Sequence, residues 1–473
     1  MTASDLPLVV DLDGTLLQSD LLFESFFSLL AHDPTKALRA AAGIAGGRAA
    51  LKARLAEDAK VDFRRLPWNS SLVAYLRDQR HQGRKIYLAS ASNQRFVDAV
   101  AEELGLFDGT FGSDEVVNLK GKAKARRLCD TFGDRAFDYI GNDAADFDVW
   151  EKAANVVVVS DSSSFVGTVK ARWPQAQHLF GAGAGLIDGL KVLRPHQWLK
   201  NLLIFLPTLA AHEIDAARLG ACLLAFVSFS LCASSVYCLN DLIDLARDRS
   251  HPTKRHRGFA SGRVPLAYGL WLYPGLLAAS LALAVMVGAP FVITLLAYGT
   301  ATLAYSLWLK RMMMVDVVTL ACLYGVRLVA GSAVAAVPIS SWLAAFALFF
   351  FFSLAIVKRY TELIARSADE PEASSGRSYT KIDLPILEAL AAASGFTAIL
   401  VFALYLNGLT AATLYQAPER LSLLCVILVY WLGRVLILAH RGQMHDDPVV
   451  FAATDRASLI CGVVAAAIIV ASL

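Results

Sequence analysis

The chain has 473 residues, of which 56% are hydrophobic, and its mean hydropathy of +0.50 is too high for an ordinary soluble protein. The formal net charge is only +3, which excludes the strongly basic surface of a nucleic-acid-binding protein. Residues up to about 180 mix polar and apolar types, whereas apolar runs of bilayer-spanning length, about 20 residues each, recur from Trp198 onward. We therefore predict a domain of ordinary size at residues 1–180 and an integral membrane domain at residues 181–473.

The N-terminal domain is predicted to begin with a short apolar strand, Leu6–Leu12, that carries one acid and is followed by a second acid and a Gly turn. The later elements follow in chain order: a helical, Ala- and Leu-rich insert at 21–84, a strand at 85–92 ending in hydroxyls, a helix at 96–104, a Lys-rich helix start at 120–124, and strands at 137–141 and 155–160. Strands that alternate with helices predict a doubly wound parallel sheet. Carboxylates at a strand's C-terminal end lie where ligands bind in such sheets, and we expect the insert to form a small helical cap there.

Motifs at the strand ends indicate which superfamily this predicted sheet resembles. They read DLDGT at residues 11–15, then a Ser after the next strand, GKAK at residues 121–124 and GNDAAD at residues 141–146. In this order they resemble the haloacid dehalogenase (HAD) superfamily. The resemblance implies that Asp11 is the nucleophile, which forms an aspartyl-phosphate, and that Asp13 is the general acid/base.

The same resemblance implies partners for a phosphoryl group. Ser90 would bind the group and Lys124 would neutralise its charge, with Lys122 as the alternative lysine. Asp146 would complete a Mg²⁺ site with Asp11 and Asp13, which lowers the charge repulsion during nucleophilic attack.

One position departs from the family pattern. Asn142 stands where the first acid of the last motif is usual, with Asp143 beside it. A non-catalytic HAD domain that serves as a scaffold is therefore the alternative. Asp11 and Asp13 are both present, and this favours an active phosphatase domain.

Ser-rich and Gly/Ala-rich pieces between residues 160 and 191 are interpreted as a connection, and nine spans are predicted after it. The spans are 199–211, 218–241, 266–288, 290–309, 315–335, 341–363, 384–406, 420–439 and 453–472. Lys and Arg concentrate in the connections after the second, fourth and sixth spans, whereas those after the third and fifth carry none. The positive-inside rule then predicts a multi-pass protein of the cell (inner) membrane, with the N-terminal domain in the cytoplasm and the C-terminus outside.

The second predicted span ends in Asn240 and Asp241 and continues as LIDLARD to Asp248, directly before a basic run at residues 249–257. Asp241, Asp244 and Asp248 fall on one face if the helix continues through them. A group of carboxylates suits Mg²⁺, which usually joins one or two of them to substrate phosphates, and the basic run supplies countercharges. A solvated helix end is the alternative, but acids at a membrane boundary are costly unless they serve a function.

This NDxxDxxxD pattern, followed by the basic run and Gly262-Arg263, resembles the UbiA superfamily of membrane transferases. The resemblance covers the second half of the chain and implies an all-α bundle of nine spans. UbiA prenyltransferases carry a second Asp-rich motif after the sixth span, which holds the Mg²⁺ of a prenyl diphosphate. Here that place reads KRYTEL at residues 358–363, which suits a phosphate monoester better than a second Mg²⁺–diphosphate site.

Other pieces share this character: RPHQWLKN at residues 194–201, YSLWLK at 305–310, Asp316 with Arg327 in the fifth span, and SYT at 378–380. With KRYTEL they resemble the decaprenyl-phosphate phosphoribosyltransferase branch of the superfamily. That resemblance implies two substrates, 5-phosphoribose 1-diphosphate and a polyprenyl phosphate, and a reaction that joins C1 of the ribose to the lipid phosphate. For RPHQWLKN, anchoring at the membrane interface is the alternative.

The resemblance also implies roles for individual residues. Asp241, Asp244 and Asp248 would hold Mg²⁺ on the sugar diphosphate, so one Mg²⁺ is expected in each domain. The basic groups divide into Lys200, Lys358 and Arg359 for the lipid phosphate, and Lys254, Arg255 and Arg257 for the 5-phosphate. The other predicted substrate contacts are Asn201, Asn240, Tyr305, Lys310, Arg327 and Tyr360.

Structural explanations compete for three of these contacts. An ion pair with Asp316 would explain Arg327 as well as a substrate contact does, because a charge within a span needs a partner. Anchoring at the interface explains Tyr305 and Lys310 almost as well as substrate binding.

The presence of a phosphatase-like domain and a transferase-like domain in one chain indicates a reaction sequence. Phosphoribosyl transfer leaves a lipid-linked ribose with a 5-phosphate, and a tethered phosphatase would meet this product at high effective concentration. We therefore expect a bifunctional enzyme that yields polyprenyl-phosphoribose for pentose glycoconjugate synthesis. The alternatives are an active transferase with a non-catalytic HAD domain and a UbiA prenyltransferase that uses a prenyl diphosphate. A transporter is disfavoured because the charges gather on one side of the membrane. No nucleic acid partner is expected. A homo-oligomer is possible.

Overall fold

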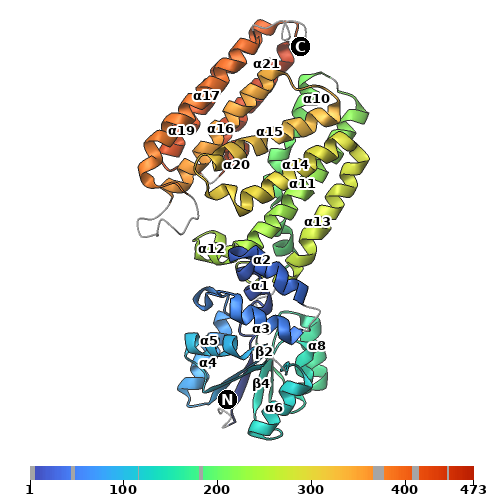
Figure 1. Ribbon diagram of the computed structural model, residues 1–473, viewed down its shortest axis with the longest axis vertical. Helices are drawn as coiled ribbons and strands as arrows, with labels where there is room; N and C mark the ends of the chain where they lie inside the picture. The colour runs from blue at the N-terminus through green and yellow to red at the C-terminus, as the bar shows by residue number, and fades with distance from the viewer. Residues whose placement is uncertain are drawn as a thin grey trace. The chain divides into compact units, whose positions relative to one another are not determined.

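The computed structural model describes residues 6–43, 48–114, 117–179, 185–212, 214–365, 378–406, 415–444 and 447–472 (Figure 1). The chain divides into two compact units. The first consists of Met1–Val192 and Cys238–Leu272, and the second of Leu193–Tyr237 and Tyr273–Leu473. The acidic stretch at the end of the second predicted span therefore belongs to the same unit as the N-terminal domain. The predicted boundary at residue 180 falls outside the described residues.

A six-stranded sheet forms the centre of the first unit. Its strands are β1 (Leu8–Asp11), β2 (Ile86–Asn93), β3 (Gly109–Ser113), β4 (Asp138–Gly141), β5 (Val156–Val159) and β6 (Gln177–Leu179). All neighbours are parallel in the order β3-β2-β1-β4-β5-β6, and Val9 pairs with Tyr87 on one side and Tyr139 on the other. The order reverses beside β1, so Asp11 lies at the switch point where ligands bind in such sheets. The predicted doubly wound parallel sheet is confirmed.

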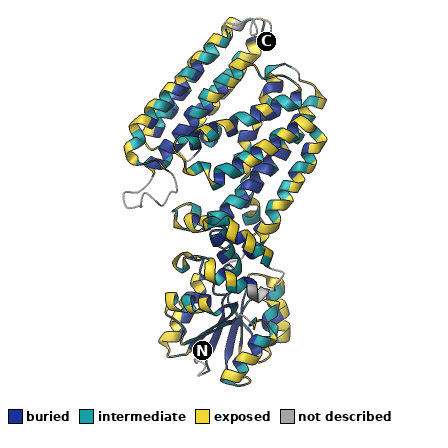
Figure 2. Cartoon of the chain, viewed as in Figure 1, coloured by how far each residue is buried: buried dark blue, intermediate teal, exposed yellow. Residues whose placement is uncertain are grey.

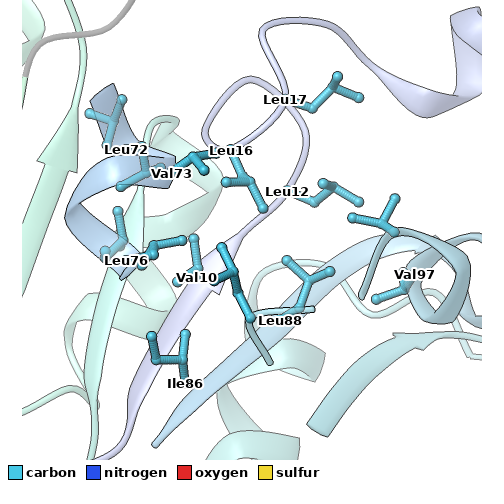
Figure 3. Packing of buried hydrophobic residues seen from close by; sticks show 14 of the residues in the cluster. Val10, Leu12, Leu16, Leu17, Leu72, Val73, Leu76, Ile86, Leu88 and Val97 are labelled. Atoms are coloured by element: carbon cyan, nitrogen blue, oxygen red, sulfur yellow. The ribbon is translucent and has the colours of Figure 1, made fainter. Parts of the chain in front are cut away.

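Successive side chains of β1 face opposite sides of the sheet, and each side has its own apolar core. On one side Val10 and Leu88 pack with Leu76 and Val97, as Figure 3 shows. On the other side Val9 is buried in a second cluster with Tyr139 and other apolar residues. The helices that complete these cores are α4 (Ser70–His81), α5 (Gln94–Leu104), α6 (Lys122–Phe132), α7 (Phe147–Trp150) and α8 (Ser163–Arg172). Because β1 is covered on both faces, its terminal carboxylate has a rigid support.

The insert between β1 and β2 is helical, as predicted. It contains α1 (Leu21–His32), α2 (Pro34–Ala42), α3 (Arg48–Asp58) and the short 3₁₀ helix η2 (Phe63–Arg65) before α4. Aspartates begin the first two helices, because the Asp20 side chain accepts a hydrogen bond from the Leu22 amide and Asp33 accepts from the Thr35 and Lys36 amides. Buried leucines of α1 and α3 form a separate cluster, so the insert is a small packed cap.

Four elements of the first unit, β3, β6, α8 and α9 (Leu186–Val192), differ from the sequence prediction. The strands β3 and β6 were not predicted, since both are short edge strands without a continuous apolar run. Residues 160–191, predicted as a connection, contain α8, β6 and α9. The Ser162 hydroxyl accepts from the Phe165 amide at the start of α8, and Val166 and Val169 are buried against the sheet. The Ser-rich run is therefore a helix N-cap.

Apolar helices make up the second unit, and two of them, α11 (Ala216–Ile243) and α13 (Leu266–Val287), extend into residues 238–272. The others are α14 (Ala289–Leu307), α15 (Val315–Ala335), α16 (Ser341–Ile364), α17 (Leu384–Leu406), α19 (Leu423–His440), α20 (Pro448–Thr454) and α21 (Arg456–Ser472). Within the described residues, seven helices are long and apolar enough to cross a membrane, and the α20–α21 pair, bent by 79°, would be an eighth crossing. Only 11% of the most apolar stretch of α13 is buried, so its remaining surface suits contact with lipid (Figure 2).

The first predicted span, 199–211, is not a long helix. Its residues lie in the 3₁₀ helix η4 (Pro195–Phe205) and the short helix α10 (Leu206–Ala210), and a proline stands at the start of each. Proline fixes φ and cannot donate a backbone hydrogen bond, which favours helix starts over a helix interior. The prediction of nine spans is therefore supported for eight segments and not for this one. The predicted connection after the sixth span falls partly on residues 366–377, outside the described residues.

Helix α15 packs closely against η4 at one glycine. A Cβ atom at Gly331 would collide with the backbone carbonyl of Ile204, and a backbone atom cannot rotate away. Gly325 lies on the same helix, and a Cβ atom there would meet nothing within 4 Å. These two glycines form a matched pair for testing the contact.

We expect Gly331→Ala to lower the midpoint of thermal unfolding in detergent by several degrees, because overpacking costs about 1–3 kcal/mol. Gly325→Ala should keep or raise the midpoint, since Ala is favoured over Gly in a helix by about 1 kcal/mol. Equal midpoints for the two variants would show that η4 does not contact α15 in this way.

Candidate active sites

The first candidate site lies at the C-terminal end of β1. The Asp11 carboxylate accepts hydrogen bonds from Lys124 Nζ at 2.6 Å and from Thr15 Oγ1 at 3.1 Å. Lys124 also donates to Tyr139 Oη at 2.9 Å, and that hydroxyl donates to Asp146 Oδ1 at 2.9 Å. Lys124 is buried, whereas the alternative lysine, Lys122, is exposed. The structure thus brings Asp11, Lys124 and Asp146 together, as the resemblance implies.

Asp13 is held by a different set of donors. Its Oδ2 accepts from Ser90 Oγ at 2.9 Å and from Ser92 Oγ at 2.8 Å, and its Oδ1 accepts from the Leu21 amide at 2.8 Å. Ser90 is fully buried and faces Asp13 across the ends of β1 and β2. The sequence prediction named Ser90 but not Ser92 as a site residue, although both stand at the same strand end.

Asn142 fits closely against the turn of the DLDGT motif. Its Oδ1 accepts from Thr15 Oγ1 at 3.0 Å, and a Cβ atom at Gly14, which has φ +78°, would collide with its amide group. The neighbouring Asp143 is exposed, and its side chain caps the short helix η3 (Ala144–Asp146). The amide in place of the usual acid therefore lies at the site and supports the loop that carries Asp11.

Burial changes the acidity of this site. Burial raises the pKa of the Asp11 carboxyl to about 7, while the Lys124 ammonium acts in the opposite direction. Burial, followed by the negative charge of Asp13, raises the pKa of Asp20 to about 6. Burial and the charge of Asp146 raise the pKa of the Tyr139 hydroxyl well above its usual range, so Tyr139 is a neutral hydrogen-bond donor here.

The second candidate site is the acidic stretch. Helix α11 ends at Ile243, Asp244 breaks the helix, and α12 (Leu245–Ser250) begins directly after it. Backbone hydrogen bonds from Asp244 to Asn240 and from Asp248 to Asp244 keep the helical direction across the break. The three acids were predicted to lie on one face of a helix. Two of them do face the same side, because Arg257 Nη1 lies 3.2 Å from Asp241 and 2.7 Å from Asp248. Asp244 instead pairs with Arg247 at 3.3 Å.

Three polar residues flank the acidic stretch. Asn240 is half-buried, and its carbonyl belongs to the helical hydrogen-bond ladder. Lys254 is half-buried and Arg255 is exposed, and both lie in the 3₁₀ helix η5 (Lys254–His256). Arg257, predicted to bind a phosphate, contacts two acids of the stretch.

Pairs of carboxylates in the two candidate sites could hold Mg²⁺. Within the described part of the chain, no three His, Cys, Asp or Glu side chains are close enough to enclose a metal ion. Pairs of carboxylates do converge on one cation, Asp241 and Asp248 on Arg257, and Asp11 and Asp146 on Lys124. Because Mg²⁺ is usually held by one or two carboxylates together with substrate phosphates, each pair fits such an ion.

In the second unit, two predicted lysines meet at a carboxylate that was not predicted. Lys200 and Lys358 both donate to Asp447 Oδ2, the latter at 3.2 Å, and Asp447 and the Lys200 side chain are almost fully buried. Lys200 Nζ also lies 5.6 Å from the centre of the Tyr324 ring. Asp447 stands directly before Pro448 at the start of α20, far from both lysines in sequence, so no local pattern pointed to it.

Arg327 lies against the other side of this cluster. Its Nε donates to Asn201 Oδ1 at 2.8 Å and its Nη2 to Tyr298 Oη at 3.3 Å. The guanidinium also contacts aromatic rings, including that of Tyr324 at 5.6 Å from the ring centre. The ring of Tyr324 is therefore shared by Lys200 and Arg327, and Lys200 shares Asp447 with Lys358, so one ring and one carboxylate link the three predicted cations.

Arg359 has a different environment from its neighbour Lys358. Its guanidinium is 2% exposed and donates to Asp316 Oδ2 at 2.6 Å, Glu362 at 2.7 Å and Tyr305 Oη at 2.6 Å. The suggested ion pair between Asp316 and Arg327 is wrong, since Asp316 binds Arg359 and accepts from the Tyr379 hydroxyl at 2.7 Å. All three nitrogens of Arg359 thus have protein partners, which is typical of a structural arginine.

Two predicted contacts lie apart from these clusters. Tyr360 follows Arg359 but its hydroxyl contacts Glu388 at 3.4 Å and His440 at 3.0 Å. Lys310 is half-buried in the 3₁₀ helix η6 (Leu309–Arg311) and interacts with other groups of the protein. The structure does not bring either of them to Asp447.

Comparisons with known proteins agree with the family resemblance predicted for each half of the chain. Residues 201–459 match the UbiA prenyltransferase family, and residues 8–164 match the haloacid dehalogenase-like hydrolases. The protein y4nM of Sinorhizobium fredii is 35% identical over 465 residues, which cover 97% of this chain and 89% of that protein. The nodulation protein NoeC of Azorhizobium caulinodans is 34% identical over 57% of this chain and 87% of its own.

A further relative is named for its reaction. The decaprenyl-phosphate phosphoribosyltransferase of Mycolicibacterium smegmatis is 38% identical over 228 residues, which cover 46% of this chain and 71% of that enzyme. The family match spans more than half of the chain, and the alignment with y4nM runs through both halves. This multi-pass membrane protein therefore belongs to the UbiA prenyltransferase family and carries a HAD-like domain at its N-terminus.

Proposed function

We propose that the protein transfers 5-phosphoribose from 5-phosphoribose 1-diphosphate to a polyprenyl phosphate, and that the HAD-like domain then removes the 5-phosphate. The product would be polyprenyl-phosphoribose, a lipid-linked pentose donor. The relative from Mycolicibacterium smegmatis, whose name describes the first reaction, supports this choice of substrates. The y4nM alignment supports a single protein with both domains, because it includes them together.

The observation that carries the proposal is the surplus of positive charge around Tyr324. Lys200 and Lys358 share one carboxylate, Asp447. Arg327 contacts the same Tyr324 ring as Lys200 and donates to the uncharged side chains of Asn201 and Tyr298. Burying unbalanced cations is costly, so a dianionic phosphate monoester is a suitable partner for them. A prenyl diphosphate would instead need a second set of carboxylates with Mg²⁺, and the corresponding segment carries Lys358 and Arg359.

The acidic stretch would bind the sugar donor. Asp241 and Asp248 would hold Mg²⁺ on its diphosphate, and the ion would stabilise the leaving group when bound. An oxygen of the polyprenyl phosphate attacks C1 of the ribose as the bond from C1 to the diphosphate oxygen breaks. No general base is required, because the attacking phosphate oxygen is already an anion. Lys254 and Arg255 are the proposed partners of the 5-phosphate, and Arg257 orients the two acids.

The phosphatase step follows from the residues around β1. The Asp11 carboxylate attacks the 5-phosphate, the bond from phosphorus to the ribose oxygen breaks, and Asp13 gives that oxygen a proton. Water then hydrolyses the aspartyl-phosphate to free phosphate. Lys124 holds Asp11 in place and balances negative charge, while Ser90 and Ser92 orient Asp13. The Asp146 carboxylate would share Mg²⁺ with Asp11 in this site.

The orientation in the membrane stays a prediction. We propose that both sites face the cytoplasm, where a soluble sugar diphosphate is available, since the basic connections gather on one side. The cell (inner) membrane is the proposed location.

The decisive experiment supplies the purified protein with Mg²⁺, a polyprenyl phosphate and labelled 5-phosphoribose 1-diphosphate, and measures the mass of the lipid product. A pentosyl lipid without the 5-phosphate is expected. Turnover of a prenyl diphosphate on an acceptor, with no labelled lipid, would refute the proposed donor and support the prenyltransferase alternative.

The variant Asp11→Asn should separate the two steps. We expect it to form lipid-linked 5-phosphoribose at the normal rate and to accumulate it, because the nucleophile of the second step is missing. Release of phosphate from the lipid at the normal rate would show that Asp11 is not the nucleophile and would refute the proposed phosphatase step.

Replacing Lys358 by Met should weaken binding of the lipid phosphate. Hydrogen bonds to charged groups contribute about 1.5–3 kcal/mol, so we expect the KM for polyprenyl phosphate to rise about ten-fold or more. The KM for the sugar diphosphate should change little. Lys381→Met, at an exposed lysine in the 3₁₀ helix η8 (Lys381–Asp383), is the matched control. Equal effects of the two substitutions would contradict the assignment.

The pH profile of the phosphatase step should depend on Lys124. Asp11 must be ionised to attack, and the Lys124 charge lowers the Asp11 pKa that burial raises to about 7. Lys124→Met should therefore move the acid limb of kcat/KM, measured on a phosphomonoester, to higher pH by about one unit. Lys122→Met should keep the wild-type profile, because that side chain is exposed. An unmoved acid limb in Lys124→Met would show that Asp11 does not control it.

A further inference from the structure

A buried ion pair joins the cap of the HAD-like domain to the acidic stretch. Arg249 Nη2 lies 2.7 Å from Glu24 Oε1, and its Nη1 lies 2.9 Å from Glu24 Oε2, which is bidentate geometry. The side chains are 8% and 4% exposed. Arg249 Nε also donates to the Ala260 carbonyl at 2.9 Å. Neither residue was a predicted site residue, and no step proposed above uses them.

Each partner of this pair is attached directly to one of the candidate sites. Glu24 lies in the first turn of α1, and the amide of Leu21, the first residue of that helix, donates to Asp13 at 2.8 Å. Arg249 lies in α12 directly after Asp248, whose carboxylate meets Asp241 at Arg257. One helical turn and one ion pair therefore separate the acid of the phosphatase site from an acid of the donor site.

Other contacts join residues 250 and 262, on either side of the basic run, to the cap and the segments that flank it. Ser250 Oγ accepts from Arg65 of η2. Gly262 has φ +76°, and a Cβ atom there would lie 2.7 Å from the Gln18 carbonyl and 3.1 Å from Pro67. Glu24 and Arg249 thus lie inside a packed interface, where removal of one charge leaves the other buried and unpaired.

We propose that Glu24 is a positioning residue for the transfer reaction: by binding Arg249 it fixes α12 and holds Asp248 in place for the sugar diphosphate. This inference rests on the proposed transfer reaction and extends it, since a residue of the phosphatase half would set the affinity of the transferase half for its donor.

The test uses the full-length chain with Glu24→Gln, Arg249→Gln and the double variant. Glu57→Gln is the control, because Glu57 is an exposed glutamate of the same cap. We expect each single variant to raise the KM for 5-phosphoribose 1-diphosphate about ten-fold with kcat nearly unchanged, and the double variant to be no worse than a single one, since the residues act as one pair. A general loss of folded protein would lower kcat instead.

A second measurement does not depend on activity. Hydrogen exchange of the amides at residues 244–257 should become faster in Glu24→Gln but not in Glu57→Gln. Unchanged KM together with unchanged exchange in Glu24→Gln would overturn the proposal.

If Glu24→Gln also loses phosphatase activity on a soluble phosphomonoester, Glu24→Asp decides, because it keeps the charge with a shorter reach. A KM and an exchange rate restored partly or fully toward the wild-type values would then support the proposal, and values equal to those of Glu24→Gln would overturn it. A wild-type protein that forms no pentosyl lipid would refute the proposed function, whereas the exchange experiment would still test the Glu24 contact.

Discussion

Buried charge is the constraint on which both units of this protein depend. An ion removed from water is stable only beside an opposite charge or enough hydrogen-bond partners. Lys124 satisfies this rule with Asp11 and the hydroxyl of Tyr139, and Arg359 satisfies it with Asp316, Glu362 and Tyr305. Around Tyr324 the cations outnumber the one carboxylate, and an anionic substrate is the natural remaining partner. In the second unit, this difference in charge balance thus separates Arg359, which supports the fold, from Lys200, Lys358 and Arg327, which are suited to binding an anion.

The two proposed reactions handle phosphate groups in different surroundings. At the end of β1, a rigid sheet and two apolar cores hold a carboxylate whose pKa burial raises to about 7. In the acidic stretch, the acids stand at a helix break and depend on neighbouring arginines for their position. The ion pair of Glu24 and Arg249 lies between these two arrangements. A mobile acidic stretch would bind a diphosphate less well than a fixed one, because ordering it would cost conformational entropy.

Patterns along the sequence were sufficient where local chemistry sets the structure. The strand before Asp11 and the long helices such as α11 and α19 follow from apolar runs of the right length, and the parallel sheet follows from the alternation of strands and helices. The misses have physical causes. The edge strands β3 and β6 are stabilised by pairing with a neighbour more than by their own residues, and the serines before α8 act as an N-cap that resembles a linker. The segment at 199–211 is apolar enough for a span, but prolines divide it into short helices.

The sequence by itself determined the two family assignments, because DLDGT, GNDAAD and NDxxDxxxD place acids at defined positions relative to a strand or a helix. Only the tertiary structure decided which charges meet. Asp447 joins Lys200 and Lys358, Asp316 pairs with Arg359 and not with Arg327, and Glu24 binds Arg249 across 225 residues of chain. The reason is that ion pairing depends on distance in space, and residues far apart along the chain carry no local signal of the neighbour that the packed helices bring to them.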